Sequence, residues 1–518
     1  MVRSGTRIPE DRQPATSRED ESSPVLLHHF LARAAAATPS AIAVRDFSGS
    51  WTYCELATYS ARFATWLRNR GVMAGGRVLL HHERTRHAVA MLYGTSSAGA
   101  TLVPVSPAVG DLRLAALVDD AAPSLVVTSR AGWEALDGRM DRTTQVIPIE
   151  AAREYIETTE PRPIKGDPAS PDDLAFLLYT SGSTSSPKAV MCPHRQVVFA
   201  TQAIAQQLQY RPDDKVFCRL PTSFDYGLYQ ALLCALAGSE LQLMPDQHDV
   251  ELLTWVKSWA PTVIPLVPSL AAMMTTLAAR ADEKLPHVRL VTNTGEVLRP
   301  NLIQALREYL PSAQVALMFG VTECKRISIL EPDGDRSRPG SVGRPLPGTE
   351  VTVTDESGLP IPSGELGEFV VRGPHVAAGY WRAPELTMER FPHEDGEPAA
   401  LRTGDFGYID SDGYLYFAGR RDDIFKRHGV RMSASEIEAA AVDIPGVAAA
   451  ALLPPTRQAD MTLVVAADLD EVGVLRELRR RLEPAKVPST CVVIEVLPLT
   501  PNGKIDRRKL EKIRDARG

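Results

Sequence analysis

A polar run suited to phosphate binding lies between Tyr179 and Val190, where the chain carries YTSGSTSSPKAV. Its hydroxyl side chains can donate hydrogen bonds to phosphate oxygens, and Gly182 lets the backbone approach an anion closely. Lys188 adds a positive charge. The run therefore predicts polyphosphate binding, although the run alone is equally compatible with a flexible Ser/Gly-rich connector.

This run is not a Walker loop, because that pattern needs a glycine directly before the lysine and a hydroxyl residue directly after it. Pro187 and Ala189 occupy those two places. Residues 174–178 are apolar and predict a buried strand, and the stretch from His194 to Gln209 has helical apolar spacing. The polar run is therefore expected on a strand-to-helix loop.

Six further short motifs are spread along nearly the whole chain. They are WTYCEL (51–56), AGATLVPVSP (98–107), FGVTE (319–323), LRTGDFGY (401–408), GRRDD (419–423) and PNGK (501–504). With the polar run, they resemble the adenylate-forming superfamily: acyl-CoA synthetases, firefly-type luciferases and the adenylation domains of nonribosomal peptide synthesis. Ser185 and Ala189 depart from the pattern, because relatives commonly carry glycine there.

The resemblance implies that ATP and Mg²⁺ are bound at matching positions. For the nucleotide these positions are Thr180, Ser181, Gly182, Ser183, Thr184, Lys188, Phe319, Gly320, Thr322, Asp405 and Arg420. Asp405 matches the acceptor of hydrogen bonds from the ribose hydroxyls, and Arg420 matches a second nucleotide contact. Taken alone, either residue is compatible with an ordinary turn or a solvated arginine.

Three residues match catalytic positions: Lys504, Glu323 and Thr184. Adenylation brings a carboxylate to the α-phosphate of ATP although both are anionic, so catalysis requires charge neutralisation and in-line positioning. Lys504 matches the lysine that bridges the two reactants, and Glu323 matches the magnesium ligand. Without the resemblance, Lys504 is better explained as a surface lysine that opens a basic tail, and Glu323 as a solvated glutamate.

The resemblance also implies two successive conformations. Asp422 matches the hinge, and Lys426 and Gly429 belong to a loop that would face the incoming thiol after the small domain rotates. Adenylation of the acid and its transfer to the thiol would then use different faces of the small domain.

Asp225 is the candidate counterion for a substrate ammonium. It stands in PTSFDYGLYQ, where amino-acid-activating relatives carry Phe-Asp and fatty or aromatic acid ligases usually carry a histidine with an apolar neighbour. A buried ammonium needs an anionic partner. The alternative is that Asp225 caps a helix over 226–236.

Other positions that line the acyl pocket in relatives fall on Phe224, Tyr226, Tyr229, Thr292, Thr294, Gly295, Met318, Arg326 and Ile327. Arg326 would add a fixed cation, and guanidinium binds carboxylate through two hydrogen bonds. The pair with Asp225 would suit a substrate with an ammonium and a second carboxylate. Alternatively, Arg326 pairs with a protein acid or faces solvent.

This pattern is most similar to stand-alone enzymes that load β-amino acids, including aspartate-type ones, onto discrete acyl carrier proteins for macrolactam polyketides. The expected activity is an AMP-forming ligase that transfers an amino acid to a carrier's phosphopantetheine thiol. An acyl-CoA ligase for a fatty or aromatic acid is the alternative, and a catalytically inactive adenylate-binding protein is a third.

The helices and strands expected around these residues indicate an α/β protein. From 25 to 420, helical stretches alternate with β-branched runs, which predicts parallel sheets covered by helices, and residues 340–373 predict an antiparallel sheet or small barrel. The resemblance divides this large domain into two doubly wound subdomains and the barrel-like one. Residues 421–518 are expected to form a small mobile α+β lid, and residues 1–24 a disordered tail.

Composition limits the partners. The net charge of −7 provides no basic field for nucleic acid, and no stretch has the length and apolar character of a membrane span. We therefore expect a cytoplasmic protein. His81, His82, Glu83 and His87 resemble metal ligands, but clustered polar residues after a strand predict a solvated loop.

Overall fold

The computed structural model describes residues 25–136, 144–161, 168–180, 188–244, 251–281, 284–393, 399–420, 424–427, 430–456, 460–499 and 505–516. Several predicted positions lie outside these residues: the tail 1–24, Ser181, Gly182, Ser183, Thr184, Asp422, Gly429 and Lys504. Lys426 is described by its backbone alone.

The first parallel sheet carries the strand that precedes the phosphate loop. Its order is β6 (Gln145–Pro148), β5 (Leu125–Thr128), β3 (Arg77–His81), β4 (Thr101–Val105), β7 (Leu174–Thr180) and β8 (Lys188–Pro193). Every pair is parallel except β7–β8, which is antiparallel. The chain segments between these strands supply α3 (Arg86–Ser97), α4 (Asp111–Ala121), α5 (Arg130–Leu136) and α6 (Ile149–Thr158), and α2 (Tyr53–Asn69) directly precedes β3.

The second sheet and one of its helices carry several of the predicted substrate-pocket residues. Its order is β15 (Arg344–Pro345), β14 (Ser328–Ile329), β13 (Gln314–Phe319), β12 (Leu290–Asn293), β11 (Val263–Leu266), β9 (Lys215–Cys218), β10 (Glu240–Leu243), β1 (Ile42–Asp46) and β2 (Gly49–Thr52). The strands from β13 to β1 run parallel. The accompanying helices are α1 (Leu27–Ala37), α7 (His194–Leu208), α8 (Asp225–Ala237), α9 (Leu252–Trp259), α10 (Pro268–Ala281) and α11 (Pro300–Tyr309).

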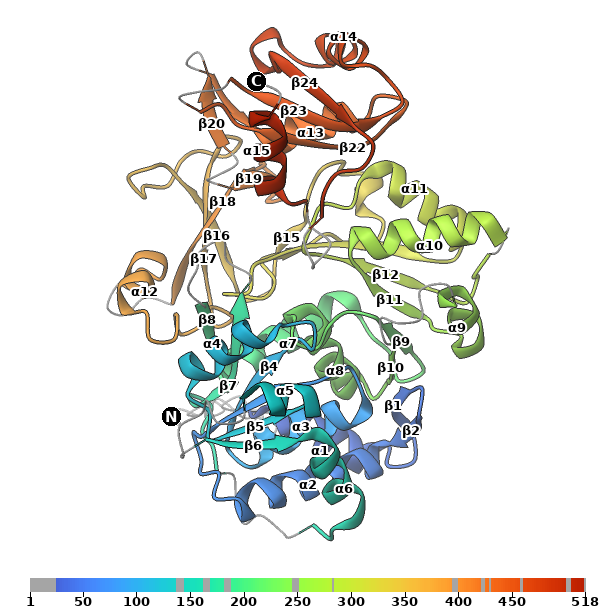
Figure 1. Cartoon of the computed structure of the whole chain (residues 1–518), viewed down its shortest axis with the longest axis vertical. Coiled ribbons are helices and arrows are strands. Elements are labelled where there is room, and N and C mark those ends of the chain that lie inside the picture. The colour runs from blue at the N-terminus through green and yellow to red at the C-terminus, as the bar shows by residue number, and fades with distance from the viewer. Residues whose placement is uncertain are drawn as a thin grey trace, which may run out of the picture.

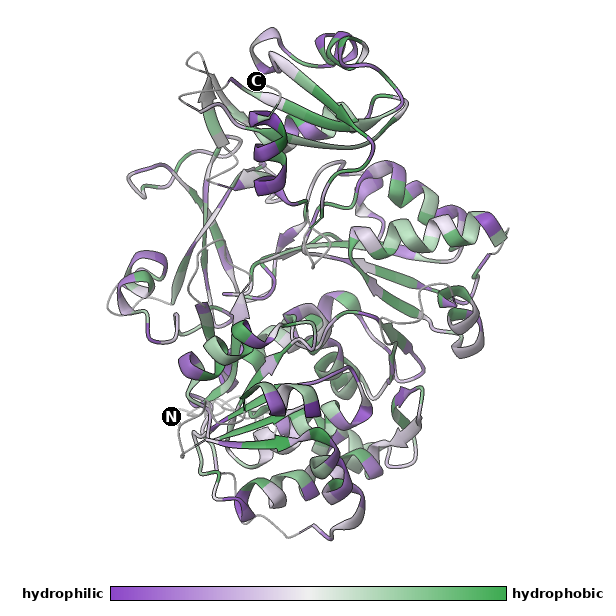
Figure 2. Ribbon diagram, in the orientation of Figure 1, coloured by the Kyte–Doolittle hydropathy of each residue, from purple (hydrophilic) through white to green (hydrophobic). Residues whose placement is uncertain are grey.

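One hydrophobic core joins the two sheets. It combines residues of β4, β7, β9 and β10 with the buried faces of α1, α2, α3, α7 and α8. Figure 2 shows hydrophobic residues along the strands and hydrophilic residues on the outer helix surfaces. Burial of this apolar surface is the main driving force that fixes α8, and with it Asp225, against the second sheet.

The early WTYCEL segment has a structural role in this core. Thr52 caps α2 by accepting a hydrogen bond from the backbone N–H of Glu55, and Glu55 accepts one from the backbone N–H of Thr52 in return. This capping box satisfies two N–H groups at the start of the helix. Trp51 packs on Tyr59, with ring centres 4.2 Å apart.

A four-stranded antiparallel sheet follows, as predicted for this part of the chain. Its order is β16 (Glu350–Thr354), β17 (Gly367–Arg372), β18 (Ala400–Ile409) and β19 (Leu415–Arg420), and α12 (Pro384–Arg390) lies between β17 and β18 in sequence. Gly407 is needed in β18, because a Cβ there would lie 2.2 Å from the carbonyl oxygen of Tyr416. Figure 1 shows this sheet between the parallel sheets and the C-terminal elements.

The C-terminal part is an α+β unit, in agreement with the expected fold class. A hairpin of β20 (Ile424–Arg427) and β21 (Val430–Ser433) precedes a sheet of β22 (Val447–Leu453), β23 (Thr462–Ala467) and β24 (Thr490–Ile494). The helices are α13 (Ala434–Val442), α14 (Glu471–Arg481) and α15 (Arg507–Asp515). This unit has its own cores around Ile437 and Leu510. The domain boundary and the hinge remain predictions.

No helix in the described part of the chain combines the length and apolar character that a membrane crossing would require.

Candidate functional site

The segment predicted to bind phosphate connects two antiparallel strands, so the expectation of a strand-to-helix loop was wrong. Thr180 at the end of β7 is the register partner of Lys188 at the start of β8, and α7 begins only after β8. Thr180 and Lys188, which flank residues 181–187, are thus paired in the sheet. The helix N-terminus at His194 lies one strand away in sequence.

The base of this hairpin is anchored from outside it. The hydroxyl of Tyr179 donates a hydrogen bond to Oδ2 of Asp120 at 2.6 Å, and the indole N–H of Trp381 donates to the Asp120 carbonyl oxygen at 3.0 Å. Burial, followed by the bond to Asp120, raises the pKa of Tyr179, so its hydroxyl remains a donor at neutral pH.

Glu323, the predicted magnesium ligand, is held by a residue that the sequence did not single out. The hydroxyl of Tyr380 donates to Oε1 of Glu323 at 2.6 Å, and the N–H of Ala377 donates to the Glu323 carbonyl oxygen at 2.8 Å. Burial raises the pKa of Tyr380, and the charge of Glu323 adds to the effect. The hydroxyl therefore stays protonated and fixes one carboxylate oxygen.

The position of Glu323 fits a site where Mg²⁺ is bound by one protein carboxylate and by the phosphates of the nucleotide. Glu323 is half-buried and keeps a second carboxylate oxygen, a hard donor of the type Mg²⁺ prefers. Mg²⁺ on a triphosphate is usually bound through one or two protein carboxylates and the phosphates themselves. Glu323 is the candidate ligand, and the described residues contain no cluster of three or more His, Cys, Asp or Glu side chains that could hold a metal ion.

The two predicted nucleotide contacts, Asp405 and Arg420, face each other across neighbouring strands. They are register partners on β18 and β19, and Nε of Arg420 lies 3.3 Å from Oδ1 of Asp405. The Asp405 side chain is buried, whereas that of Arg420 is 66% exposed. An exposed guanidinium over a buried carboxylate can move aside for a ribose without unfolding the sheet.

The FGVTE segment forms a tight turn after β13. Gly320 is required there, because a Cβ would lie 2.2 Å from the carbonyl oxygen of Lys325. Phe319 packs against Phe369 and Phe417 of the antiparallel sheet, with ring centres 5.9 and 5.2 Å apart. The Thr322 carbonyl oxygen accepts a hydrogen bond from Nζ of Lys325 at 2.9 Å.

The structure brings Asp225 and Arg326 together as a buried pair. Nη1 of Arg326 lies 4.0 Å from Oδ2 of Asp225, and the two side chains are 5% and 6% exposed. Asp225 is the first residue of α8, Phe224 takes the cap position, and no described side chain caps the helix. The alternative role of Asp225 as a helix cap is therefore not supported, and Arg326 does not face solvent.

Aromatic and hydroxyl side chains surround this pair. The Arg326 guanidinium lies over the ring of Tyr226, 4.9 Å from its centre, and its Nη1 donates to the Lys325 carbonyl oxygen at 2.6 Å. The Tyr226 hydroxyl bonds to the carbonyl oxygen and Oγ1 of Thr292 at 2.8 and 2.7 Å. Tyr229 follows Asp225 by one helical turn. The polar pocket is thus built on α8, β12 and the turn after β13.

The remaining predicted pocket positions lie at its edges or in the core. Phe224 is partly exposed, and a Cβ on Gly295, whose φ is +92°, would lie 3.8 Å from the Phe224 ring. Thr294 and Met318 are buried. Ile327 belongs to the hydrophobic core of the antiparallel sheet, which favours a packing role at that position.

Lys325 is a buried cation that the sequence did not single out. Its side chain is 1% exposed, its φ is +67°, and Nζ donates to Sγ of Cys192 at 3.3 Å. The ammonium also lies 5.8 Å from the ring centre of Tyr229. A lysine directly after a motif predicts a solvated side chain, and nothing local in the sequence signals this burial.

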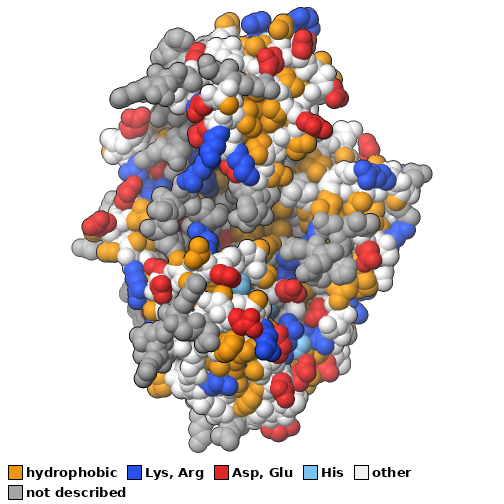
Figure 3. All heavy atoms as spheres, in the orientation of Figure 1, with side chains coloured by type: hydrophobic (Ala, Val, Ile, Leu, Met, Phe, Trp, Pro, Cys, Tyr) orange, Lys and Arg blue, Asp and Glu red, His pale blue; other side chains and the backbone are white. Residues whose placement is uncertain are grey.

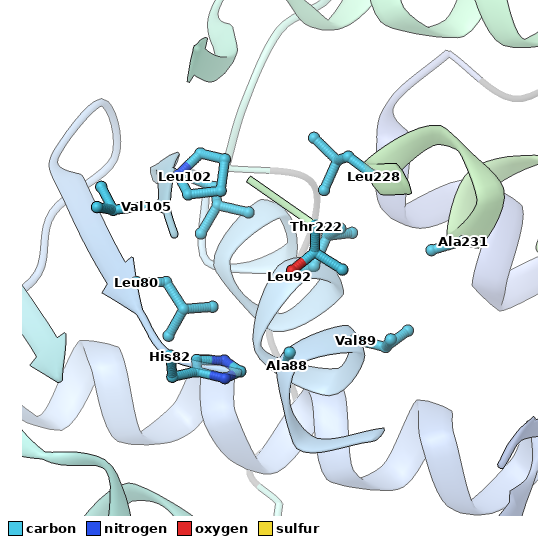
Figure 4. Close-up of a pocket in the computed structure, with 11 residues that line it drawn as sticks. Leu80, His82, Ala88, Val89, Leu92, Leu102, Val105, Thr222, Leu228 and Ala231 are labelled. Atoms are coloured by element: carbon cyan, nitrogen blue, oxygen red, sulfur yellow. The ribbon is translucent and has the colours of Figure 1, made fainter. Parts of the chain in front are cut away.

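A separate apolar pocket lies on the other side of α8. Figure 4 shows Leu80, Leu92, Leu102 and Leu228 around it, with His82 at one end. No predicted site residue lines this pocket. The expected solvated loop at His81, His82 and His87 was wrong: all three are buried, and burial lowers the pKa of His82 to about 3. The described residues there contain no metal cluster.

The predicted thiolation face lies on the C-terminal unit. Lys426 is in β20, where its register partner is Arg431 of β21. Figure 3 shows Lys and Arg side chains over α15, toward the centre of the molecule, and the last turn of that helix carries Lys512 and Arg514. The predicted roles of Asp422, Gly429 and Lys504 concern residues outside the described ones.

Comparison with known proteins identifies what the chain is similar to. Residues 31–381 match the family described as AMP-binding enzyme. One plipastatin synthase polypeptide of Bacillus subtilis (strain 168) is 32% identical over 495 residues, which cover 93% of this chain and 19% of the relative. The chain therefore spans about a fifth of the length of that curated relative.

Two solved structures resemble the chain over most of its length. VinN is 41% identical with a TM-score of 0.70, covering 76% of this chain and 98% of VinN, and it has been solved in complex with L-aspartate and with 3-methylaspartate. ATP-bound MatB from Rhodopseudomonas palustris is 26% identical with a TM-score of 0.84, covering 94% of this chain and 99% of MatB.

Proposed function

Because the chain belongs to the AMP-binding enzyme family, we propose that the protein uses ATP and Mg²⁺ to adenylate an amino acid that carries a second carboxylate. The activated group would then pass to the phosphopantetheine thiol of a separate acyl carrier protein in secondary metabolism. AMP-forming ligase is the enzyme class that the family match and the amino-acid-activating relatives support.

The buried pair of Asp225 and Arg326 is the observation that carries the choice of substrate. The two charges balance each other at 4.0 Å, but this distance is too long for a direct hydrogen bond, so each group keeps hydrogen-bonding capacity for a ligand. An ammonium can bind Asp225 while a carboxylate binds Arg326, so a zwitterion with a spare carboxylate satisfies both. VinN, which is similar in sequence and fold, binds L-aspartate and 3-methylaspartate in its solved complexes. A β-amino acid of this type is the proposed substrate.

Adenylation would proceed by attack of the free substrate carboxylate on the α-phosphorus of ATP. The P–O bond to diphosphate breaks, diphosphate leaves, and a mixed anhydride remains. Lys504 is proposed to bring its positive charge between the two anionic groups. Glu323, with one oxygen fixed by Tyr380, is proposed to present the other to Mg²⁺, which supplies further charge neutralisation on the phosphates.

Asp405 and Arg420 are proposed to hold the ribose end of the nucleotide. Their register pairing on β18 and β19 fixes the carboxylate relative to the FGVTE turn, because both segments pack in one hydrophobic core. The remaining loop residues Thr180 and Lys188 would flank the phosphates from the β7–β8 hairpin.

The test is amino-acid-dependent exchange of labelled diphosphate into ATP. The panel contains L-aspartate, 3-methylaspartate, β-alanine, L-alanine and hexanoate, and the expected order places the two dicarboxylates first. Preference for hexanoate would instead support an acyl-CoA ligase. Intact-mass measurement of a phosphopantetheinylated carrier protein, compared with CoA, then identifies the thiol acceptor.

A further inference from the structure

Residues 378–381 lie alongside β8, the strand that begins at Lys188. The backbone N–H of Trp381 donates a hydrogen bond to the Ala189 carbonyl oxygen at 2.9 Å. Val190 of β8 forms an antiparallel bridge with Tyr380. The strand β8 therefore has a pairing partner on each edge, with β7 on one side and this short segment on the other.

Two adjacent side chains of this segment reach different parts of the molecule. The hydroxyl of Tyr380 holds Oε1 of Glu323 at 2.6 Å, and the indole N–H of Trp381 donates to the Asp120 carbonyl oxygen at 3.0 Å. Successive side chains of an extended segment leave it on opposite faces. One short segment thus connects the candidate magnesium ligand with the C-terminal end of α4.

That end of α4 is itself held by side chains from other elements. The last carbonyl groups of a helix have no partner within the helix. Here Arg77 donates to the Ala121 carbonyl oxygen, and Nη1 of Arg382 donates to the Asp119 carbonyl oxygen at 3.4 Å. Two cations at this end also suit the negative end of the helix dipole. Asp120 therefore lies on a well-anchored turn.

The carboxylate of Asp120 returns the connection to β7. Its Oδ2 accepts the hydrogen bond from the Tyr179 hydroxyl at 2.6 Å. Tyr179 directly precedes Thr180, the register partner of Lys188. Hydrogen bonds to an ionised acceptor are stronger than those between neutral groups. The position of Asp120 is thus coupled to the two described residues that flank the predicted phosphate-binding run.

We infer that Asp120 is a positioning residue for the triphosphate of ATP. It acts through Tyr179, which fixes the β7–β8 pair, while Trp381 ties it to the segment that holds Glu323. The phosphates and their Mg²⁺ then meet the two halves of the site at a fixed separation. This inference rests on the proposed function and deepens it.

The test is the binding of MgATP to Tyr179→Phe in the absence of an amino acid. The substitution removes the donor and keeps the ring, which packs against a hydrophobic core of the first sheet. The dissociation constant of MgATP should rise about tenfold, near the lower end of what a hydrogen bond to a charged group contributes. The dissociation constant of AMP, which lacks the β- and γ-phosphates, should be unchanged.

Tyr414→Phe is the matched control. The Tyr414 hydroxyl also donates to a carboxylate, that of Glu331, at 2.8 Å outside the predicted site. Both variants lose one hydrogen bond of the same kind, so a general loss of stability cannot explain a difference between them. MgATP and AMP should bind to Tyr414→Phe as they bind to the wild type.

Substitutions of Asp120 test whether it acts through Tyr179. Asp120→Ala should weaken MgATP binding at least as much as Tyr179→Phe does. The double variant should be no weaker than Asp120→Ala alone, because the two groups act through one hydrogen bond. Asp120→Asn keeps an acceptor oxygen for the hydroxyl and should recover most of the affinity that Asp120→Ala loses.

An unchanged MgATP affinity in Tyr179→Phe would overturn the inference, and so would equal losses for MgATP and AMP. Additive losses in the double variant, or no recovery in Asp120→Asn, would show that the two residues do not act through their shared bond. Failure of the proposed function is distinct, because it appears as the absence of amino-acid-dependent diphosphate exchange in the wild type, whereas nucleotide binding to wild type and variants can still be compared.

Discussion

Arg326 and Asp225 lie 4.0 Å apart in a pocket where both side chains are almost fully buried. The separation is too long for a direct hydrogen bond, so the pair neutralises charge without filling the acceptor and donor positions of either group. A ligand that lies alongside the pair could place its ammonium against Asp225 and a carboxylate against Arg326. The pair is thus arranged to accept a zwitterion.

Replacement of Asp225 by asparagine should abolish most amino acid activation. The substitution keeps the size of the side chain but leaves Arg326 as an unbalanced buried charge and removes the partner of the ammonium. Loss of a buried partner corresponds to a fall in kcat/KM of at least about a hundredfold. Diphosphate exchange with the preferred amino acid checks this value.

Asp111→Asn is the matched control for Asp225→Asn. Asp111 is also the first residue of a helix, α4, but it is exposed and outside the pocket. Equal losses in the two variants would contradict the assignment of Asp225 to the substrate.

Tyr380→Phe should weaken the response to magnesium. Without the hydroxyl, Oε1 of Glu323 loses a 2.6 Å hydrogen bond and the carboxylate becomes less well oriented. We expect a fall in kcat of about tenfold and a higher Mg²⁺ concentration for half-maximal rate, since a bond to a charged group is worth about 1.5 to 3 kcal/mol. Magnesium titration of diphosphate exchange measures both effects.

Tyr414→Phe provides the comparison for this pair. Its hydroxyl donates to Glu331 at 2.8 Å outside the predicted site. A shift in magnesium dependence of the same size in Tyr414→Phe, or no shift in Tyr380→Phe, would show that Tyr380 does not position a metal ligand.

The pH dependence of stability should depend in part on Asp214. Burial alone would raise the pKa of this carboxyl, but hydrogen bonds from Arg289 and Thr262 outweigh it and hold the pKa below its usual value. A depressed pKa contributes stability above the unfolded-state value near 4, and the contribution disappears as the pH falls through the folded-state pKa.

Asp214→Asn should therefore lower the free energy of unfolding at pH 7 by about 1.5 to 3 kcal/mol. The difference from the wild type should shrink as the pH is lowered below 4, which thermal unfolding at a series of pH values can follow. A difference that is the same at pH 7 and pH 3 would contradict the role of the charge.

Much of the fold could be predicted from local patterns. The apolar run at 174–178 became β7, and the helical spacing after His194 became α7, because both signals arise within one element. The strand β8 was missed, since it starts directly behind Pro187 and its pairing with β7 depends on a return of the chain. The predicted phosphate-binding run was therefore expected before a helix, whereas the strands on either side of residues 181–187 pair with each other.

The site was predictable where one residue type carries the signal. Asp225 and Arg326 could be named because they match pocket positions of the adenylate-forming superfamily and carry charges that suit a zwitterion. Tyr380 and Lys325 were missed because their partners, Glu323 and Cys192, lie 57 and 133 residues away in the chain. A single sequence carries no record of such distant contacts.

The most direct test of the central claim is to measure the substrate preference of the purified wild type and of Arg326→Leu by diphosphate exchange. The account predicts that the wild type has a higher kcat/KM for L-aspartate than for L-alanine, β-alanine or hexanoate, and that Arg326→Leu loses this preference. If hexanoate is the best substrate of the wild type, or if Arg326→Leu retains the preference for L-aspartate, the buried pair does not select a substrate with a second carboxylate.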